Sequence, residues 1–387
     1  MAADAKLVLV PPLMSIAAFY FSYFAYAGIG LAFLPLYFAA RGLDAGEIAF
    51  LAALPYIART FAPAAWGWLA DATGRRRTIV VFSCAAGAVC FALMPRVEGV
   101  AGIGWLVAIL ALLSAGAVPL VEAITLGMLA GQPGPQLGKY GPIRLWGSVG
   151  FVFATFGGGA WLDFWPATTL PPMLVALSLF SLAFALALPP GRTRVPVARK
   201  TPLLTASVRA LLAAGFCMSA AHGTLYTFFT LYLERSGHSG IAIGSLWTLG
   251  VLAEIVVFLF LPALFRRHTL SAILLASLVC AVVRFLAIGW LPPSLWLLVP
   301  VQLLHAATFG AFHAAAVAAV HRVFPEHAQA RGQTLFSSIA YGAGGAAGAL
   351  IAGWAWQTSG SALAFSASAA AALVGACFAW RLGRFGL

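Results

Sequence analysis

Charged side chains are scarce in this chain. Asp, Glu, Lys and Arg together make up 8% of its 387 residues, whereas an ordinary soluble domain carries about 25%. Hydrophobic residues account for 62% of the chain, which is more apolar surface than one globular core can bury. The composition therefore excludes an ordinary soluble protein and indicates a protein that resides in a lipid bilayer.

Cysteines are few, and the motifs of enzymes are missing. The five cysteines all lie inside apolar runs, and none belongs to a Cys-x-x-Cys pair, so neither a disulfide framework nor a zinc site is indicated. The sequence also lacks a phosphate-binding glycine loop and a nucleophile–base spacing. We therefore expect no enzyme activity, no cofactor and no metal, and we do not expect ATP to be the energy source.

Positive charge is in excess, but its distribution does not indicate a nucleic-acid partner. The net charge is +12, yet stretches of basic residues interleaved with stacking aromatic residues are missing. Most of the 22 Lys and Arg residues instead form short clusters between apolar runs, on the side of the two termini. Because such positive charge marks the cytoplasmic side of a membrane protein, we expect a multi-pass protein of the plasma (bacterial inner) membrane with both termini in the cytoplasm.

Apolar runs of about 20 residues recur along the chain, and each is long enough to cross a hydrocarbon layer roughly 30 Å thick. They are longer than the strands of a membrane barrel and do not alternate between polar and apolar residues, so they indicate helices. The sequence predicts an all-α membrane protein with twelve transmembrane helices, over residues 10–39, 45–69, 77–95, 101–130, 141–163, 169–189, 207–233, 241–264, 270–291, 295–322, 332–357 and 362–381.

The longest polar interval divides these spans six and six. It covers residues 189–202 and is rich in Pro and Arg, which is typical of a linker. We therefore expect three parts: an N-terminal six-helix bundle over residues 1–189, a cytoplasmic linker over 190–206, and a C-terminal six-helix bundle over 207–387.

The two halves share a weak internal repeat. "LYFAARGLDAGEIAFLAALPYIAR" (36–59) aligns with "LYLERSGHSGIAIGSLWTLGVLAE" (231–254), and "LLSAGAVPLVEA" (112–123) aligns with "LLHAATFGAFHA" (303–314). Both pairs fall at the same place in their halves. A parallel repeat of this kind predicts two pseudo-symmetric bundles, with a substrate site at their interface near the middle of the membrane.

Ionisable residues occupy matching positions in these alignments. Arg59 aligns with Glu254, and Glu122 aligns with His313. A charged side chain at the centre of a spanning helix costs about 2.5–3.5 kcal/mol on insertion scales, so such residues are functional candidates by default. The repeat therefore predicts one site divided between the two halves.

The loop after the second span carries a recognisable motif. "GWLADATGRRR" (67–77) resembles the signature of the major facilitator superfamily. Four further segments (139–155, 246–258, 280–289 and 302–315) are similar to the phenylpropionate permease branch, which is related to lactose permease and the nucleoside–proton symporters. The resemblance implies the major facilitator fold, transport by alternating access, and a gating role for Asp71, Arg75 and Arg76.

The same resemblance suggests roles for individual residues. In lactose permease, a glutamate of the fourth helix pairs with an arginine of the fifth at the sugar site, and Glu122 and Arg144 stand at the matching positions. Lactose permease also has an ionisable cluster on helices eight to ten that serves proton coupling. Glu254, Arg284 and either His305 or His313 fall on those helices here.

The residues themselves leave several alternatives open. Glu122 and Arg144 form either a structural ion pair or part of the substrate site. Arg59 and Glu254 either pair as a latch between the bundles or act separately, as a carboxylate anchor and a proton carrier. Arg284 stays charged at any usable pH, so it needs an anion nearby.

The tenth span presents a polar face. Gln302, His305 and His313 lie on one side of that helix, and histidine titrates near neutral pH, which suits proton transfer. Each of these histidines is either part of the site or simply hydrogen-bonded within the core. His222 of the seventh span is a further candidate for the same cluster.

Together these observations predict a secondary active transporter, a proton-coupled symporter that imports an aromatic or other monocarboxylate such as phenylpropionate. The alternatives are a nucleoside or oligosaccharide–proton symporter and a drug–proton antiporter. The expected partners are a small-molecule substrate, protons and the lipid bilayer, and the protein is expected to be a monomer. The residues expected to bind substrate are Arg59, Glu122, Arg144, Trp146, Trp247, Arg284, Gln302 and His305. Those expected to couple protons are Glu122, Glu254, His305 and His313.

Overall fold

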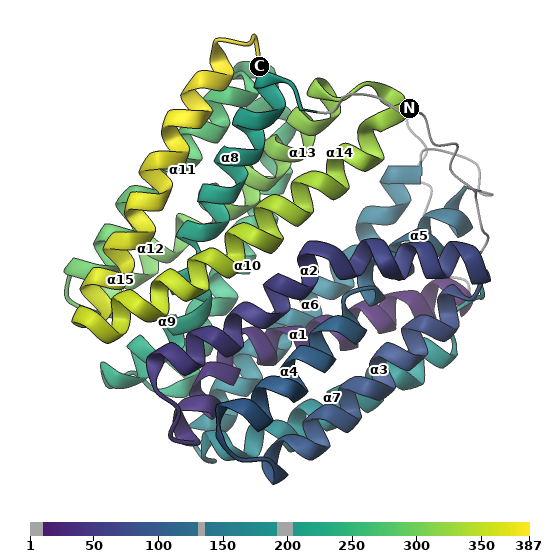
Figure 1. Cartoon of the computed structure of the whole chain (residues 1–387), viewed down its shortest axis with the longest axis vertical. Coiled ribbons are helices and arrows are strands. Elements are labelled where there is room, and N and C mark those ends of the chain that lie inside the picture. Colours follow the sequence, from purple (N-terminus) through teal and green to yellow (C-terminus); the bar gives the residue numbers. More distant parts are fainter. Residues whose placement is uncertain (1–10, 131–135, 192–203) are drawn as a thin grey trace.

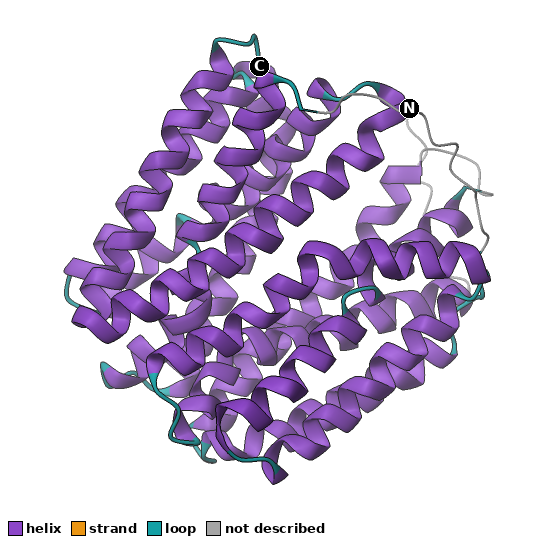
Figure 2. Cartoon of the chain, viewed as in Figure 1, coloured by secondary structure: helices purple, strands orange, loops and turns teal. Residues whose placement is uncertain are grey.

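The protein is built almost entirely of helices, and the part of the chain that the structure describes contains no strand (Figure 2). The computed structural model describes residues 11–130, 136–191 and 204–387. Seven α-helices precede the linker: α1 Pro11–Ala40, α2 Ala45–Thr73, α3 Arg76–Leu93, α4 Gly99–Ser114, α5 Ala117–Leu129, α6 Gln136–Leu162 and α7 Leu170–Leu186. Eight follow it: α8 Ala206–Ala221, α9 Gly223–Arg235, α10 Gly240–Arg267, α11 Leu270–Trp290, α12 Leu295–Leu303, α13 Phe312–Val323, α14 Gln329–Phe336 and α15 Gly345–Gly383.

The predicted twelve spans are confirmed once the long C-terminal segment is divided. Eleven segments of the described chain are long and apolar enough to cross a membrane, and the last of them runs over 58 residues from Glu326 to Gly383. Its backbone leaves the helical conformation at Ser359 and at Gly360, where φ is 75°. Glycine tolerates this left-handed conformation, so the segment turns there and makes two spans.

Four predicted spans are interrupted helices, and in the eleventh a π-helical stretch over Ser337–Gly344 lies between α14 and α15. The fourth span is α4 followed by α5, and the seventh is α8 followed by α9, with the break at His222. In the tenth span, a π-helical stretch over Ala306–Ala311 lies between α12 and α13. Interruptions in membrane helices are tolerated where neighbouring groups satisfy the backbone, and π-bulges are frequent at functional sites.

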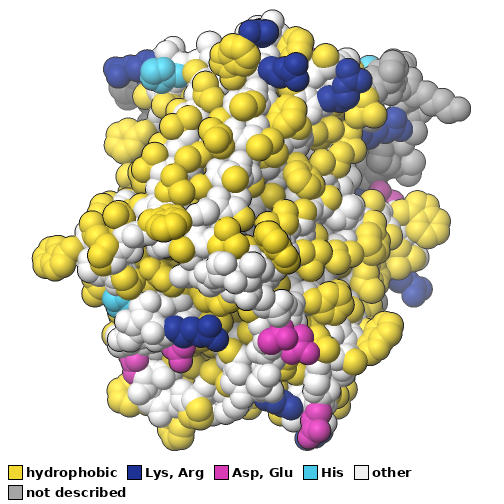
Figure 3. Space-filling view, turned by 60° about the vertical axis from the view of Figure 1, so that its left-hand side comes forward, with side chains coloured by type: hydrophobic (Ala, Val, Ile, Leu, Met, Phe, Trp, Pro, Cys, Tyr) yellow, Lys and Arg dark blue, Asp and Glu magenta, His cyan; other side chains and the backbone are white. Residues whose placement is uncertain are grey.

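The helices form two bundles that lie side by side (Figure 1). Helices α1 to α7 make one group, in purple to blue, and helices α8 to α15 make the other, in teal to yellow. On the face drawn in Figure 3, hydrophobic side chains cover the middle of the molecule, while most of the visible Lys, Arg, Asp and Glu side chains lie toward its ends. Trp296 is 91% exposed and Leu259 is 75% exposed, which is favourable only for side chains that face lipid.

Helices α6 and α10 join the two bundles at a glycine-lined crossing. A Cβ atom at Gly159, Gly240 or Gly244 would meet backbone atoms of the opposite helix, so only glycine allows this approach. The Thr155 and Thr248 hydroxyls hydrogen-bond across the crossing at 3.1 Å. The Asp163 carboxylate accepts hydrogen bonds from the backbone N–H of Gly240 at 2.5 Å and of Ile241 at 3.0 Å.

Helices α2 and α15 make the equivalent crossing in the other half of the repeat. A Cβ at Gly353 would meet Ala49, and one at Gly345 would meet the Tyr56 ring. The Gln357 side chain donates to the Asp44 carboxylate at 2.8 Å. Asp44 also caps the start of α2, just as the aligned Ser239 caps the start of α10. The two crossings therefore follow the internal repeat and lie at the same end of the molecule.

The motif loop lies at the opposite end of α2. Gly74 caps this helix with φ at 69°, and Arg76 pairs with Asp71 at 2.9 Å. Arg77 donates to the carbonyl of Leu188 at 3.3 Å, which ties the loop to the end of the sixth span. Asp71, Arg75 and Arg76, the expected gating residues, are therefore placed together in this loop.

The α6–α10 crossing gives a direct test of how the bundles meet. Gly244→Val puts a side chain against the Thr155 carbonyl, and overpacking of this kind costs about 1–3 kcal/mol. We expect a lower thermal unfolding midpoint and faster maleimide labelling of a cysteine placed at the fully buried Thr155, in a background without the native cysteines. Gly157→Val on α6 is the control, because its Cβ meets nothing within 4 Å. Equal labelling in both variants would contradict the crossing.

Candidate functional site

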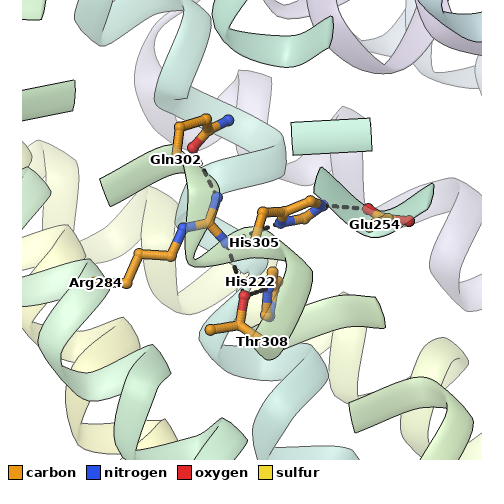
Figure 4. A network of polar contacts seen from close by, with 6 residues as sticks. All are labelled: His222, Glu254, Arg284, Gln302, His305 and Thr308. Carbon is orange, nitrogen blue, oxygen red and sulfur yellow. Dashed lines mark hydrogen bonds and ion pairs between the residues drawn. The ribbon is translucent and has the colours of Figure 1, made fainter. Parts of the chain in front are cut away.

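Arg284 and five other polar side chains form a cluster in the C-terminal bundle: His222, Glu254, Gln302, His305 and Thr308 (Figure 4). Arg284 lies on α11 and is fully buried, with 0% exposure. Its guanidinium keeps its charge in any environment that a protein provides. A buried charge is tolerated only when it is paired and hydrogen-bonded, so the partners of Arg284 define this cluster.

The tenth span supplies three acceptors to Arg284. Its Nη1 donates to His305 Nδ1 at 2.8 Å and to Thr308 Oγ1 at 2.9 Å, and its Nη2 donates to Gln302 Oε1 at 2.8 Å. These three residues are spaced three apart, at the end of α12 and in the π-helical stretch that follows it. Residues three apart on a helix are neighbours on its surface, so one face of the interrupted span forms the cradle for the guanidinium.

The cluster extends from His305 to a carboxylate on α10. His305 Nε2 lies 2.8 Å from Glu254 Oε1, so the counter-ion of Arg284 is separated from it by a single imidazole ring. On the other side, His222 Nε2 lies 3.3 Å from Thr308 Oγ1, and His222 Nδ1 lies 2.9 Å from the carbonyl of Met218. The break between α8 and α9 is what places His222 in the cluster.

Glu122 and Arg144 do not form the ion pair that the sequence suggested. Glu122 Oε1 accepts a hydrogen bond from the Tyr140 hydroxyl at 3.2 Å. The guanidinium of Arg144 lies over the Phe24 ring, 3.9 Å from its centroid, and 5.6 Å from the centroid of Tyr20. Arg144 lies in the third turn of α6, and the aromatic side chains of α1 hold it by cation–π contact, where a direct pair with Glu122 was expected.

Arg59 and Glu254 are not in direct contact either, so this structure does not contain the predicted latch between them. Arg59 of the N-terminal bundle lies over the Tyr341 ring of the C-terminal bundle, 5.2 Å from its centroid. The Tyr341 hydroxyl lies 2.6 Å from His313 Nδ1. Arg59 thus contacts the other bundle through an aromatic ring, and Glu254 is held by His305.

The charged residues of both bundles nevertheless converge at one interface. Glu254 is close enough to interact electrostatically with Arg284, His313 and Arg144, and His313 interacts with Arg59 as well. Glu122 interacts with both Arg144 and Arg59. Since these residues come from opposite bundles, the structure brings the predicted divided set of charges together.

The two predicted tryptophans differ in their placement. Trp247 is buried, donates to Thr230 Oγ1 at 2.8 Å, and stacks on Tyr226 with ring centroids 6.2 Å apart. Tyr226 in turn stacks on His222 at 5.7 Å, so Trp247 supports the cluster around Arg284. Trp146 is 44% exposed on α6 and is not part of that cluster.

Sequence reasoning missed Thr308. A threonine in an apolar span is usually bonded to its own helix, so it gives no signal alone. The spacing of Gln302, His305 and Thr308 at every third residue would have revealed it.

Comparisons with known proteins agree with this architecture. A family model described as the MFS_1 like family matches residues 13–367. The probable 3-phenylpropionic acid transporter of Escherichia coli (strain K12) is 33% identical over 234 residues, which cover 57% of this chain and 60% of that protein. The maltose permease of Geobacillus stearothermophilus is 28% identical over 341 residues, covering 84% of this chain and 83% of that protein.

Solved structures show the same fold. The crystal structure of the nucleoside transporter NupG superposes with a TM-score of 0.82 at 18% identity, covering 97% of this chain and all 100% of that one. The family match spans nearly the whole chain and agrees with the paired bundles of membrane helices. This chain is therefore a transporter, not an enzyme, and it belongs to the MFS_1-like family of the major facilitator superfamily.

Proposed function

We propose that this transporter is a proton-coupled symporter that imports a small aromatic monocarboxylate such as phenylpropionate. The observation that carries the proposal is the distribution of charge at the interface of the two bundles. In the C-terminal bundle, Arg284 donates to three acceptors through its two Nη atoms, and the His305 ring separates it from the carboxylate of Glu254. In the described part of the N-terminal bundle, Arg59 and Arg144 form no ion pair.

The balance of charge favours an anionic substrate. The intramembrane set contains three cations, Arg59, Arg144 and Arg284, and two carboxylates, Glu122 and Glu254. With both carboxylates ionised, the set carries one excess positive charge, which a monocarboxylate would neutralise. A neutral sugar or nucleoside would leave that excess uncompensated in a membrane interior, where uncompensated charge is costly.

Aromatic side chains next to Arg144 favour an aromatic acid as the substrate. Phe24 and Tyr20 lie against Arg144, and Tyr23 and Tyr26 continue this aromatic surface along α1. Rings of this kind pack against other rings in offset or edge-to-face arrangements. The similarity to a probable 3-phenylpropionic acid transporter supports the same class of substrate.

Proton coupling follows from the position of Glu254. When Glu254 takes up a proton, the intramembrane cations lose one negative counter-charge, and a substrate carboxylate replaces that charge. Proton and anion therefore favour each other's binding, which is the requirement for symport. His313, which faces Glu254 electrostatically, and Glu122 are further places for a proton.

The proposed transport cycle moves the two bundles relative to each other. In the transport cycle the two bundles rock about the central site. The bundles are the units 1–189 and 207–387, and the linker 190–206 joins them. Asp71, Arg75 and Arg76 contribute to gating. The transporter works as a monomer in the bacterial inner membrane, with both termini in the cytoplasm and with lipid as its surroundings. Nucleosides, oligosaccharides and exported drugs are the competing substrates.

Glu254→Gln tests the coupling. This change keeps the shape of the side chain but removes the proton site, so we expect proteoliposomes with an imposed pH gradient to lose accumulation of phenylpropionate while still exchanging it across the membrane. The measurement is uptake of labelled phenylpropionate, with Glu234→Gln at the exposed end of α9 as the matched control. Accumulation by Glu254→Gln equal to that of the wild type would exclude Glu254 as the coupling residue.

Arg144→Gln tests the anchor for the carboxylate. A charged hydrogen bond contributes about 1.5–3 kcal/mol, so we expect roughly a tenfold to hundredfold weaker binding of phenylpropionate. Binding of 3-phenylpropanol, which has the ring without the carboxylate, should change little. Arg96→Gln, at the exposed end of the third span, serves as the control.

The binding assay should also include uridine and maltose. Tight binding of either neutral compound, together with an unchanged affinity of Arg144→Gln for phenylpropionate, would overturn the assignment of an anionic substrate.

A further inference from the structure

The His305 ring is held at both of its nitrogens. Nδ1 lies 2.8 Å from Arg284 Nη1, and Nε2 lies 2.8 Å from Glu254 Oε1. The ring also stacks on Phe309, with centroids 5.5 Å apart. The imidazole therefore has one defined orientation between a permanent cation and a carboxylate (Figure 4).

The partner at Nδ1 decides where the proton of the ring resides. A guanidinium has only N–H donors and no acceptor, so Nδ1 must be the unprotonated, accepting nitrogen. The single ring proton then lies on Nε2, which donates to Glu254. The hydrogen-bond partners thus assign the neutral Nε2–H tautomer, as is usual for a histidine whose second nitrogen has a fixed partner.

The other hydrogen bonds of the cluster agree with this tautomer of His305. Thr308 Oγ1 accepts from Arg284, so its own proton is available for His222 Nε2, and His222 Nδ1–H donates to the carbonyl of Met218. Gln302 accepts from the other side of the guanidinium. Every hydrogen bond in the cluster therefore runs outward from Arg284.

A second proton on His305 would break this pattern of hydrogen bonds. It would place an Nδ1–H against the N–H of Arg284, so a donor would face a donor and one positive charge would face another in a buried site. The ionisable groups packed around His305 are Glu254 of α10, Arg284 of α11 and His222 at the α8–α9 break. Of these, only Glu254 can take up a proton without breaking a hydrogen bond of the cluster, because its second oxygen can be protonated while Oε1 still accepts from His305.

We propose that Arg284 locks His305 as the neutral Nε2–H tautomer, so that His305 is a positioning residue and Glu254 carries the coupling proton in this cluster. This inference rests on the proposed proton coupling and decides between the residues that could serve it. His313 provides the contrast. Its Nδ1 faces the Tyr341 hydroxyl at 2.6 Å, and a hydroxyl can either donate or accept, so nothing in that contact prevents protonation of His313.

The tautomer of His305 can be tested without any transport measurement. The experiment is nitrogen NMR of the full-length protein in lipid nanodiscs, with ¹⁵N-labelled histidine. The signals of His305 and His313 are assigned by their loss in His305→Gln and His313→Gln. We expect His305 to keep an unprotonated Nδ1 and a protonated Nε2 between about pH 5 and pH 9. A His305 signal that gains a second proton in this range, or that carries its proton on Nδ1, would overturn the proposal.

Transport separates positioning from proton carrying. A glutamine at position 305 can accept from Arg284 and donate to Glu254, but it cannot be protonated. We expect His305→Gln to slow the initial rate of uptake several-fold and to keep a steady-state accumulation ratio set by the pH gradient, whereas Glu254→Gln abolishes that ratio. A His305→Gln variant that exchanges substrate but does not accumulate it would make His305 the carrier. If the wild type itself shows no coupling to the pH gradient, the proposed function fails, and the NMR result still decides on the lock.

Discussion

The burial of one guanidinium organises the C-terminal bundle. Arg284 has no contact with solvent, and its charge cannot be removed by deprotonation in any condition that the protein meets. The interruption of the tenth span turns three neutral acceptors toward it, and the imidazole of His305 joins it to the nearest carboxylate. Because the His305 ring lies between Arg284 and Glu254, protonation of the carboxylate changes the charge near Arg284 without removing any of its hydrogen bonds.

The contacts between the bundles have the properties that a moving interface needs. At the α6–α10 and α2–α15 crossings, glycines bring backbones together without interlocking side chains. The charged groups at those crossings are Asp163 and Asp44, at the ends of helices, and the Thr155–Thr248 hydrogen bond at the α6–α10 crossing is neutral. Groups at helix ends can exchange a protein partner for water when the bundles separate, so opening this end of the molecule leaves no charge unpaired in the apolar interior.

The sequence predicted the depth of each functional residue in the membrane better than its partner. Hydrophobic runs and the internal repeat place Arg59 opposite Glu254 and Glu122 opposite His313 along the helices, and the structure brings these residues to a common interface. Periodicity cannot decide which rotamer a long side chain adopts, or that an aromatic ring will take the place of a carboxylate beside Arg59 and Arg144. The π-helical stretch that contains Thr308 is equally invisible in the pattern.

The two bundles hold their arginines in different ways, and the difference suits different tasks. Arg59 and Arg144 lie against aromatic rings, and a ring stabilises a cation through its quadrupole without neutralising it. Their N–H groups therefore remain able to bind an anion from solution. Arg284 has three acceptors already in place and is fully buried, so in this structure it is not accessible to a substrate. In the proposed cycle, the N-terminal cations therefore bind the carboxylate, and the Arg284 cluster senses the proton. Since Glu254 faces both sets electrostatically, the loss of its negative charge is felt by the substrate cations as well as by Arg284, so coupling requires no movement of a charge from one bundle to the other.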